Sequence, residues 1–418
     1  MPLPAEGHTI DLSNPLDMLY LNGDKTELEK ALKLFRKNGG LKRYRLAQSD
    51  NVQKVLEEIA AIGPDKISPI LYESYSENLR KAVDQVFKRD SDTGLSDRLR
   101  ANVSRFAAYK ALNATREVQQ KLGEDIDEAK RVIRTYNRYQ ATEYNTTVSR
   151  SRTAKQFEQF NDPDSLRLFP NLRWLPSRSV NPREQHILFY NLVWAKDDDF
   201  WSENTPGSLW NCKCDWEETN DPVTQGNPKG NKSAKGLCGN PAKTGEVFTE
   251  DHPYYNADIE SLKEKNIAWY ELLKVDTNEY LPEHVSNDGG LLLSSLDRIQ
   301  EGRKSNNEKS KFKKEHDMCL NLAKHDYRIV YLKTVEGSYD ITINGIPADL
   351  KKLKSHNNIL KKAEHAINEQ KAKIVIYEFE NFNSDILTRL SELKRKGYQA
   401  IWYKSSAPNV LHYINVVI

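Results

Sequence analysis

The stretch SYDITINGIPADLKKLKS, residues 338–355, decides the fold of the last quarter of the chain. Asn344-Gly345 is a strong signal for a two-residue hairpin loop, because a type I′ turn needs positive φ at both central positions. A loop of this length fixes the register of the two strands. The sequence therefore predicts a β-hairpin in which Asp340 lies directly opposite Asp349.

This pair of acids needs a physical explanation, because like charges directly opposite each other destabilise a sheet. Side chains alternate along a strand, so Asp340, Asp349 and Lys351 share one face of the hairpin while the other face is apolar. A divalent cation would offset the repulsion, since carboxylate oxygens suit Mg²⁺ or Mn²⁺. The residues alone leave two interpretations open: a metal site, or two solvated acids that Lys351 screens.

Length and composition place limits on the protein as a whole. A chain of 418 residues predicts two or three domains, and 38% hydrophobic with 29% charged residues is typical of globular cores. No apolar run approaches the ~18 residues of a transmembrane helix, so we expect no membrane partner. The N-terminus lacks the pattern of a secretory signal. Four cysteines are too few for a disulfide framework, which favours a reducing compartment.

Net charge differs along the chain. Residues 311–418 hold 18 Lys and Arg against 12 Asp and Glu, while the first 310 residues hold 44 against 48. A basic C-terminal part on a mildly acidic body is compatible with a phosphate-rich partner for that part.

The hydrophobic pattern predicts a multidomain protein. Apolar residues at three- and four-residue spacing indicate a mostly helical body over 50–160. A loop-rich subdomain with many Trp, Pro, Asn and Gly follows over 165–255, and it includes a long polar loop at 220–236. A polar connector is expected over 286–310. The predicted divisions are an N-terminal extension at 1–49, a body at 50–285, a linker at 286–310 and a C-terminal domain at 311–418.

The C-terminal domain is predicted to be α/β, with a mixed sheet covered by helices. A helix over 308–324 precedes three strands, which begin with YRIVYLKT, GSYDITI and IPADLKKL. A helix over 358–371, the strand KIVIYEFE, a helix over 384–396 and the strands AIWYK and LHYINVV complete the order.

The helix–three-strand–helix–strand order and the set Asp340, Asp349-Leu350-Lys351 resemble the core and signature of PD-(D/E)xK nucleases. Tyr339 stands where the signature has proline, a position that commonly varies. More narrowly, DITINGIPADLKKLKSHNNILKKAEHAINEQKAKIVIYEFE resembles the C-terminal tRNA-nuclease toxin domains of CdiA-type contact-dependent inhibition systems. The resemblance implies a metal-dependent phosphodiester hydrolase.

Carried over residue by residue, the resemblance implies that Asp340 and Asp349 bind Mg²⁺ or Mn²⁺, with Glu315 as a third catalytic and metal-binding acid. Lys351 would orient or deprotonate the attacking water, or stabilise the developing negative charge. Gln370 is the candidate for a catalytic group from the second helix. Candidates for contacts with nucleic-acid phosphates are Lys352, Lys354, His356 and Asn358. Exposed helix charges, helix-end and capping groups and a solvated lysine face are the alternatives for these additional residues.

The middle of the chain carries a second resemblance. WLPSRSVNPREQHILFYNLVWAKDDDFWSENTPGSLWNCKCDW contains Arg183-x-x-His186 and ends in Cys212-Lys213-Cys214. This succession resembles the phage Mu F-like minor head (head morphogenesis) proteins, whose motif ends in Cys-Arg-Cys. Lys213 keeps the charge of that arginine but loses its planar fork. The resemblance covers about 50–260 and implies a capsid-associated role near the portal or inside the head, without catalysis.

The cysteines of this motif have two possible roles, a structural metal site or packing. Cys212 and Cys214, with Cys238 and either His186 or His252, could hold a structural Zn²⁺. Cys-x-Cys differs from the usual two-residue gap of zinc knuckles, so the sequence favours structural packing over metal.

Together these resemblances predict a phage-associated minor head protein with a C-terminal metal-dependent endoribonuclease toxin, and tRNA as the expected substrate. The expected partners are RNA, a cognate immunity protein and phage portal or capsid proteins. The protein is expected in the virion or the cytoplasm of the producer, and the effector in the cytoplasm of the target cell. Two alternatives stay open: a non-catalytic module that binds nucleic acid or a capsid partner, and a metal-dependent deoxyribonuclease.

Overall fold

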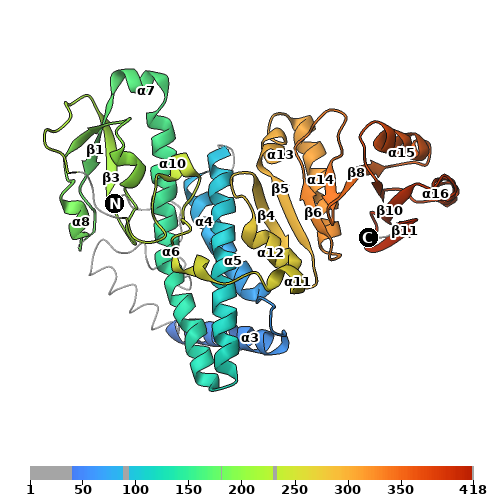
Figure 1. Cartoon of the computed structure of the whole chain (residues 1–418), viewed down its shortest axis with the longest axis horizontal. Helices are drawn as coiled ribbons and strands as arrows, with labels where there is room; N and C mark the ends of the chain where they lie inside the picture. The colour runs from blue at the N-terminus through green and yellow to red at the C-terminus, as the bar shows by residue number, and fades with distance from the viewer. Residues whose placement is uncertain (1–39, 88–93, 180, 229–232, 417–418) are drawn as a thin grey trace.

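The computed structural model describes residues 40–87, 94–179, 181–228 and 233–416, with side chains from residue 51 onward. Three regions follow one another along the long axis of the molecule (Figure 1). A small sheet lies at one end, long helices lie in the middle, and a large sheet with its covering helices lies at the other end. The mostly helical body and the mixed C-terminal sheet are as predicted; residues 1–39 of the predicted N-terminal extension lie outside the described residues.

Long helices form the middle region. Their bounds are α3 Gly40–Ala61, α4 Pro69–Val86, α5 Gly94–Leu122 and α6 Ile126–Phe160. The start of α4 shows how the sequence specifies where a helix begins. The Ser68 hydroxyl accepts a hydrogen bond from the Leu71 amide at 3.2 Å, and Pro69 occupies the first turn. Helix α5 is buried along most of its length.

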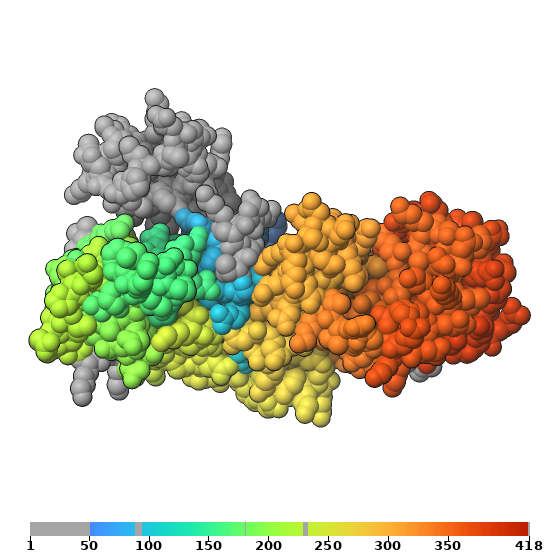
Figure 2. Space-filling model, turned by 90° about the horizontal axis from the view of Figure 1, so that it is seen from above, coloured from blue at the N-terminus to red at the C-terminus, as the bar shows by residue number. Residues whose placement is uncertain are grey.

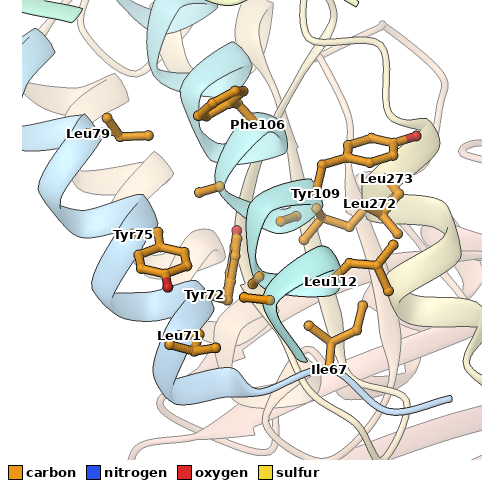
Figure 3. Close-up of a cluster of buried hydrophobic side chains, with 14 of the residues drawn as sticks. Ile67, Leu71, Tyr72, Tyr75, Leu79, Phe106, Tyr109, Leu112, Leu272 and Leu273 are labelled. Carbon is orange, nitrogen blue, oxygen red and sulfur yellow. The ribbon is translucent and has the colours of Figure 1, made fainter. Parts of the chain in front are cut away.

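The core of the middle region lies between α4, α5 and α12 (Ile267–Lys274) (Figure 3). In Figure 3, Tyr72 of α4 and Leu112 of α5 lie among these buried side chains, and Leu272 and Leu273 approach α5 from α12. The Tyr72 and Trp269 rings meet edge to face, with centroids 5.2 Å apart. Helix α12, which is distant from α4 and α5 in the sequence, thus shares one hydrophobic core with them.

The Trp- and Cys-rich region forms a small three-stranded antiparallel sheet in the order β2-β1-β3. Its core is aromatic, with Trp174, Trp201 and Trp216 all buried. The described residues within 220–236 hold no helix or strand, as their composition predicted. The elements between α6 and α12 are α7 Pro163–Leu168, β1 Asn171–Leu175, α8 Glu184–Ile187, β2 Val193–Ala195, α9 Phe200–Glu203, β3 Asp215–Thr219, α10 Pro241–Thr244, η2 Pro253–Asn256 and α11 Leu262–Lys265.

The C-terminal region is one eight-stranded mixed sheet in the order β11-β10-β9-β8-β7-β6-β5-β4. Strand β9 is parallel to β8 and β10, and β5 is parallel to β6, while the other neighbours are antiparallel. The bounds are β4 Tyr280–Val285, β5 Leu291–Ser295, α13 Leu296–Glu301, α14 Asn306–Ala323, β6 Arg328–Tyr331, β7 Ile341–Ile343, β8 Ile346–Leu353, α15 Ile359–Asn368, β9 Ile374–Phe379, α16 Ser384–Arg395, β10 Gln399–Lys404 and β11 Ala407–Ile414.

Helices cover the two faces of this sheet unequally. Helix α14 packs on one face, where Met318 and Cys319 join Ala348 and Leu350 of β8 in one buried cluster. Helices α15 and α16 pack on the other face, in a second cluster that contains Val375 and Tyr377 of β9 and Trp402 of β10. A polar side chain of β8 that points toward this second face therefore lies on the same side of the sheet as α15.

The stretch 286–310, expected to be a polar connector, contains β5, α13 and the first residues of α14. All five residues of β5 are buried because the strand lies inside the sheet. A strand that is buried on both faces reads as a short continuous apolar run, and LLLSS is too short a run to be recognised from its period. The sheet therefore begins before the predicted domain at 311–418, with β4 and β5 added to its edge.

Ion pairs and packing join the helical region to the sheet. The Arg303 guanidinium makes a bidentate pair with the buried Asp97 carboxylate of α5, at 2.6 and 2.8 Å. The Arg80 guanidinium donates to the Pro282 carbonyl on β4 at 2.5 Å. In the view of Figure 2, the orange residues of the sheet region adjoin the yellow and blue residues of the middle region, and the red residues lie at the far end. None of the helices within the described ranges combines the length and apolar character needed to cross a bilayer.

Candidate active site

The hairpin that carries the two acids forms as the sequence predicted. Asn344 and Gly345 have φ angles of 49° and 82°, the positive values that a type I′ turn requires. Ile343 pairs with Ile346, and Ile341 pairs with Ala348. Continuing this register by one residue brings Asp340, just before β7, opposite Asp349 in β8.

Asp349 is fully buried and unusually placed for a carboxylate. Its exposed fraction is 0%, and neither of its oxygens accepts a hydrogen bond of normal geometry from a residue that the structure describes. The Lys351 ammonium forms an ion pair with it. An ionised group in such a position is costly unless a further positive partner is present.

Asp340 lies against Asp349 and shows the electrostatic consequence. Burial, followed by the hydrogen bond and negative charge of Asp349, raises the pKa of Asp340 to about 7. Two groups act in the opposite direction: the Leu350 amide donates to the Asp340 carboxylate at 3.1 Å, and the Lys351 charge favours its ionised form. In the metal-free protein the Asp340 carboxyl is therefore partly protonated near neutral pH.

Gln370 joins this group from the turn that follows α15. The Lys351 ammonium donates to the Gln370 Oε1 atom at 3.4 Å, and the Gln370 amide nitrogen donates to the Ser338 carbonyl at 3.3 Å. Gln370 thus connects the lysine to the segment that precedes Asp340. Four of the predicted residues, Asp340, Asp349, Lys351 and Gln370, are brought together in one place.

Tyr377 belongs to the same neighbourhood and was not anticipated. It is the register partner of Lys351, and its buried hydroxyl donates to the Ile359 carbonyl at 3.0 Å. Burial, and then the charge of Asp349, raises the pKa of Tyr377. The strand KIVIYEFE alternates its side chains, so pairing this strand with β8 would have placed Tyr377 on the face of Asp349 and Lys351.

Glu315 lies apart from the two acids. It reaches the sheet from α14, but its carboxylate accepts a hydrogen bond from the Tyr331 hydroxyl at 2.7 Å and from Arg298 at 3.0 Å. Among the described residues, the ligand atoms of Glu315, Asp340 and Asp349 do not all lie within 4.8 Å of one another. The buried Arg298 guanidinium holds Glu315 on the α14 face of the sheet, so we leave Glu315 out of the site.

The predicted phosphate contacts have different surroundings. Lys352 is turned to the α14 face and pairs with the buried Glu378 carboxylate at 2.6 Å, so its charge is already compensated. The Lys354 side chain is 79% exposed, and the His356 ring is 3.7 Å from Asp385. Asn358 is exposed at the N-cap of α15 but makes no capping hydrogen bond with its side chain. Lys354, His356 and Asn358 thus follow one another at the surface where β8 leads into α15.

No protein-family model and no curated protein matches the chain. Among solved structures, it is similar to a chain of the CdiA-CT/CdiI toxin and immunity complex from Burkholderia pseudomallei. The match has 16% sequence identity and a TM-score of 0.23, and it covers 27% of this chain and 89% of that chain. The phage-head resemblance stays a prediction from the sequence.

The charges of the site indicate which kind of ion it can bind. Two adjacent carboxylates and an ammonium, fixed by a glutamine, carry a net charge of −1 when both acids are ionised. The full burial of the Asp349 carboxylate beside a second acid and the raised pKa of Asp340 are features that a divalent cation would resolve. The donor set of carboxylate oxygens therefore fits Mg²⁺ or Mn²⁺.

Proposed function

We propose that the C-terminal region is a metal-dependent endonuclease whose site is formed by Asp340, Asp349, Lys351 and Gln370. The observation that carries the proposal is the buried Asp349 carboxylate, whose oxygens accept no normal hydrogen bond while a second carboxylate lies against it. A structural role would favour satisfied or solvated acids. Asp340 and Asp349 would hold the cation, which when bound polarises the phosphoryl oxygen and lowers the pKa of water.

The protein residues contribute position and charge. The Lys351 ammonium lies between the Asp349 carboxylate and the Gln370 amide, so its location is fixed before any substrate arrives. A fixed ammonium can hold the attacking water in line with the phosphorus atom, and it can stabilise the negative charge that develops there. Gln370 is a positioning residue for Lys351. Lys354, His356 and Asn358, near the start of α15, would contact flanking phosphates.

We further propose that the substrate is RNA, with tRNA as the expected target, and that the region acts as a toxin with a cognate immunity protein. The support is the resemblance of residues 340–380 to CdiA-type tRNA-nuclease domains. We also propose a minor head role for the body at 50–285, supported by the succession from Arg183 to Cys214. Mass spectrometry of purified phage particles tests that role: the full chain should be present, and its absence would refute the role.

The catalytic proposal is tested with the full chain, total tRNA and plasmid DNA in one competitive reaction with Mg²⁺. We expect cleavage of tRNA that EDTA stops, and its loss in Asp349→Ala. Asp297→Ala is the matched control, because Asp297 is an exposed acid on α13 with 65% side-chain exposure. Cleavage by Asp349→Ala at the parental rate would refute the site. Cleavage of plasmid alone would identify a deoxyribonuclease. No cleavage with any metal, together with nucleic-acid binding that EDTA does not change, would favour a binding module.

A further inference from the structure

A second cluster of reactive side chains lies in the small three-stranded region, far along the chain from the hairpin acids. His186 of α8 meets Cys212 and Cys214, which come just before β3. One ligand atom from each residue lies within 4.8 Å of the others. All three are buried, with exposed fractions of 2%, 5% and 8%. The neutral imidazole and two thiols are the donor types that zinc selects.

The spacing of the atoms fits one ion. The His186 Nδ1 atom is 3.3 Å from the Cys212 sulfur and 3.6 Å from the Cys214 sulfur. With Zn–S near ~2.3 Å and Zn–N near ~2.0 Å, a tetrahedral angle separates sulfur and nitrogen by about 3.5 Å. A single ring nitrogen makes only one good hydrogen bond, yet two sulfurs converge on it. Packing alone gives no reason for that convergence.

The surrounding groups orient these ligands. The other ring nitrogen of His186 lies 3.2 Å from the Ser208 hydroxyl, which leaves Nδ1 free to face the sulfurs. The Cys214 amide donates to the Cys212 sulfur at 3.4 Å. Such hydrogen bonds to the free ring nitrogen and to a sulfur are the usual outer support of a metal site.

The local backbone delivers the cysteines to this place. Asn211 has a φ of 58°, which turns the chain just before Cys212, and the Cys212 amide donates to the Leu209 carbonyl at 3.0 Å. Asp215 then begins β3 and pairs with Leu175 of β1.

The other candidates from the sequence lie elsewhere. Cys238 is exposed, and its thiol lies 3.3 Å from the Asp251 carboxylate. The His252 Nδ1 atom accepts a hydrogen bond from the Tyr254 amide at 3.1 Å. The sequence preference for packing over metal rested on the unusual Cys-x-Cys spacing, which the placement of His186 offsets.

We propose that His186, Cys212 and Cys214 bind one Zn²⁺ ion, with a water molecule at the fourth position. The ion would connect α8 to the start of β3 in a region whose strands have only three to five residues. Small, loop-rich units commonly need such a covalent or metal cross-link, because their hydrophobic cores are limited. The role is independent of the proposed nuclease site.

The test measures metal in the full chain purified under reducing conditions. Elemental analysis should find about one zinc per chain in the parent and in Cys238→Ser, and less than a tenth of that in Cys212→Ser and Cys214→Ser. Cys238→Ser is the matched control, because it makes the same chemical change at an exposed cysteine outside the cluster. Zinc retained by Cys214→Ser at the parental level would overturn the assignment.

A second measurement keeps the test valid if the cysteine variants do not fold. The parent is stripped with a chelator and loaded with Co²⁺, and its near-ultraviolet absorption is recorded. Thiolate ligands give charge-transfer bands that carboxylates do not, so the hairpin acids cannot imitate the signal. We expect an intense band that one equivalent of Zn²⁺ abolishes. A parent that holds no zinc as purified and gives no thiolate band with Co²⁺ refutes the proposal.

Discussion

Replacing Asp349 by asparagine should change local stability in a way that depends on pH. The pKa of Asp340 in the folded, metal-free protein is about 7, against an ordinary value of 3.8. Because the folded value is raised, the stabilising contribution of the protonated acid is fully present below about pH 4 and is lost as the pH rises through 7. Asp349→Asn removes the neighbouring charge that contributes to this loss.

The magnitude follows from the same two values. Their difference corresponds to about 4 kcal/mol at ~1.36 kcal/mol per pKa unit. Burial is the largest cause and Asp349 follows it, and the partial exposure of Asp340 reduces the effect further. We therefore expect the free energy of local unfolding of Asp349→Asn, taken relative to that of the parent, to rise by about 1–2 kcal/mol from pH 5 to pH 8. The loss of the ion pair with Lys351 lowers the stability at both pH values, so its effect largely cancels in this comparison.

Hydrogen exchange of the peptides that cover residues 341–353 is the assay, because it reports local opening and does not require the whole chain to unfold in one step. Without metal, the ratio of protection between Asp349→Asn and the parent should rise about five- to thirtyfold from pH 5 to pH 8. Asp297→Asn should show no such rise. A ratio that is equal at the two pH values, or that falls, would refute the close electrostatic contact of the two acids.

Three further predictions concern the same region. Because the pKa of Asp340 is about 7 and a ligand must lose its proton, Mg²⁺ affinity measured by calorimetry should fall steeply from pH 8 to pH 6, and equal affinities would contradict this. Lys351→Met should slow cleavage by about 100-fold or more while Mg²⁺ still binds in the same titration, and unchanged cleavage would exclude a role for the ammonium. Glu315→Gln should leave cleavage within about twofold but destabilise the protein by about 2 kcal/mol in urea unfolding, because the buried Arg298 loses a carboxylate partner; a large loss of cleavage would return Glu315 to the site.

The hairpin could be predicted because its information is local. Asn344-Gly345 specifies the turn, the turn specifies the register, and the alternation of polar and apolar residues specifies the faces. The helices of residues 50–160 could likewise be predicted, because their apolar residues recur at three- and four-residue spacing. Gln370 was predicted from its place after the apolar stripe of residues 359–367 together with the nuclease resemblance, and the structure places it beside Lys351 in the turn after α15.

Other features depend on contacts between distant segments, which no local pattern contains. Glu315 could not be excluded from the sequence, because its partner Arg298 lies in a stretch that reads as a polar connector. Strand β4 contains Pro282 and alternates weakly, so only its pairing with β5 reveals it. The choice of His186 over His252 as the neighbour of the two cysteines is likewise decided by the tertiary fold.

The most direct test of the central claim is to locate Mn²⁺ by anomalous scattering in crystals of the full chain. The account predicts a peak bound directly by carboxylate oxygens of both Asp340 and Asp349, with the Lys351 ammonium beside it, and no such peak in Asp349→Ala. Crystals at saturating Mn²⁺ with no ion between these two carboxylates, or with the two side chains pointing apart, would contradict it.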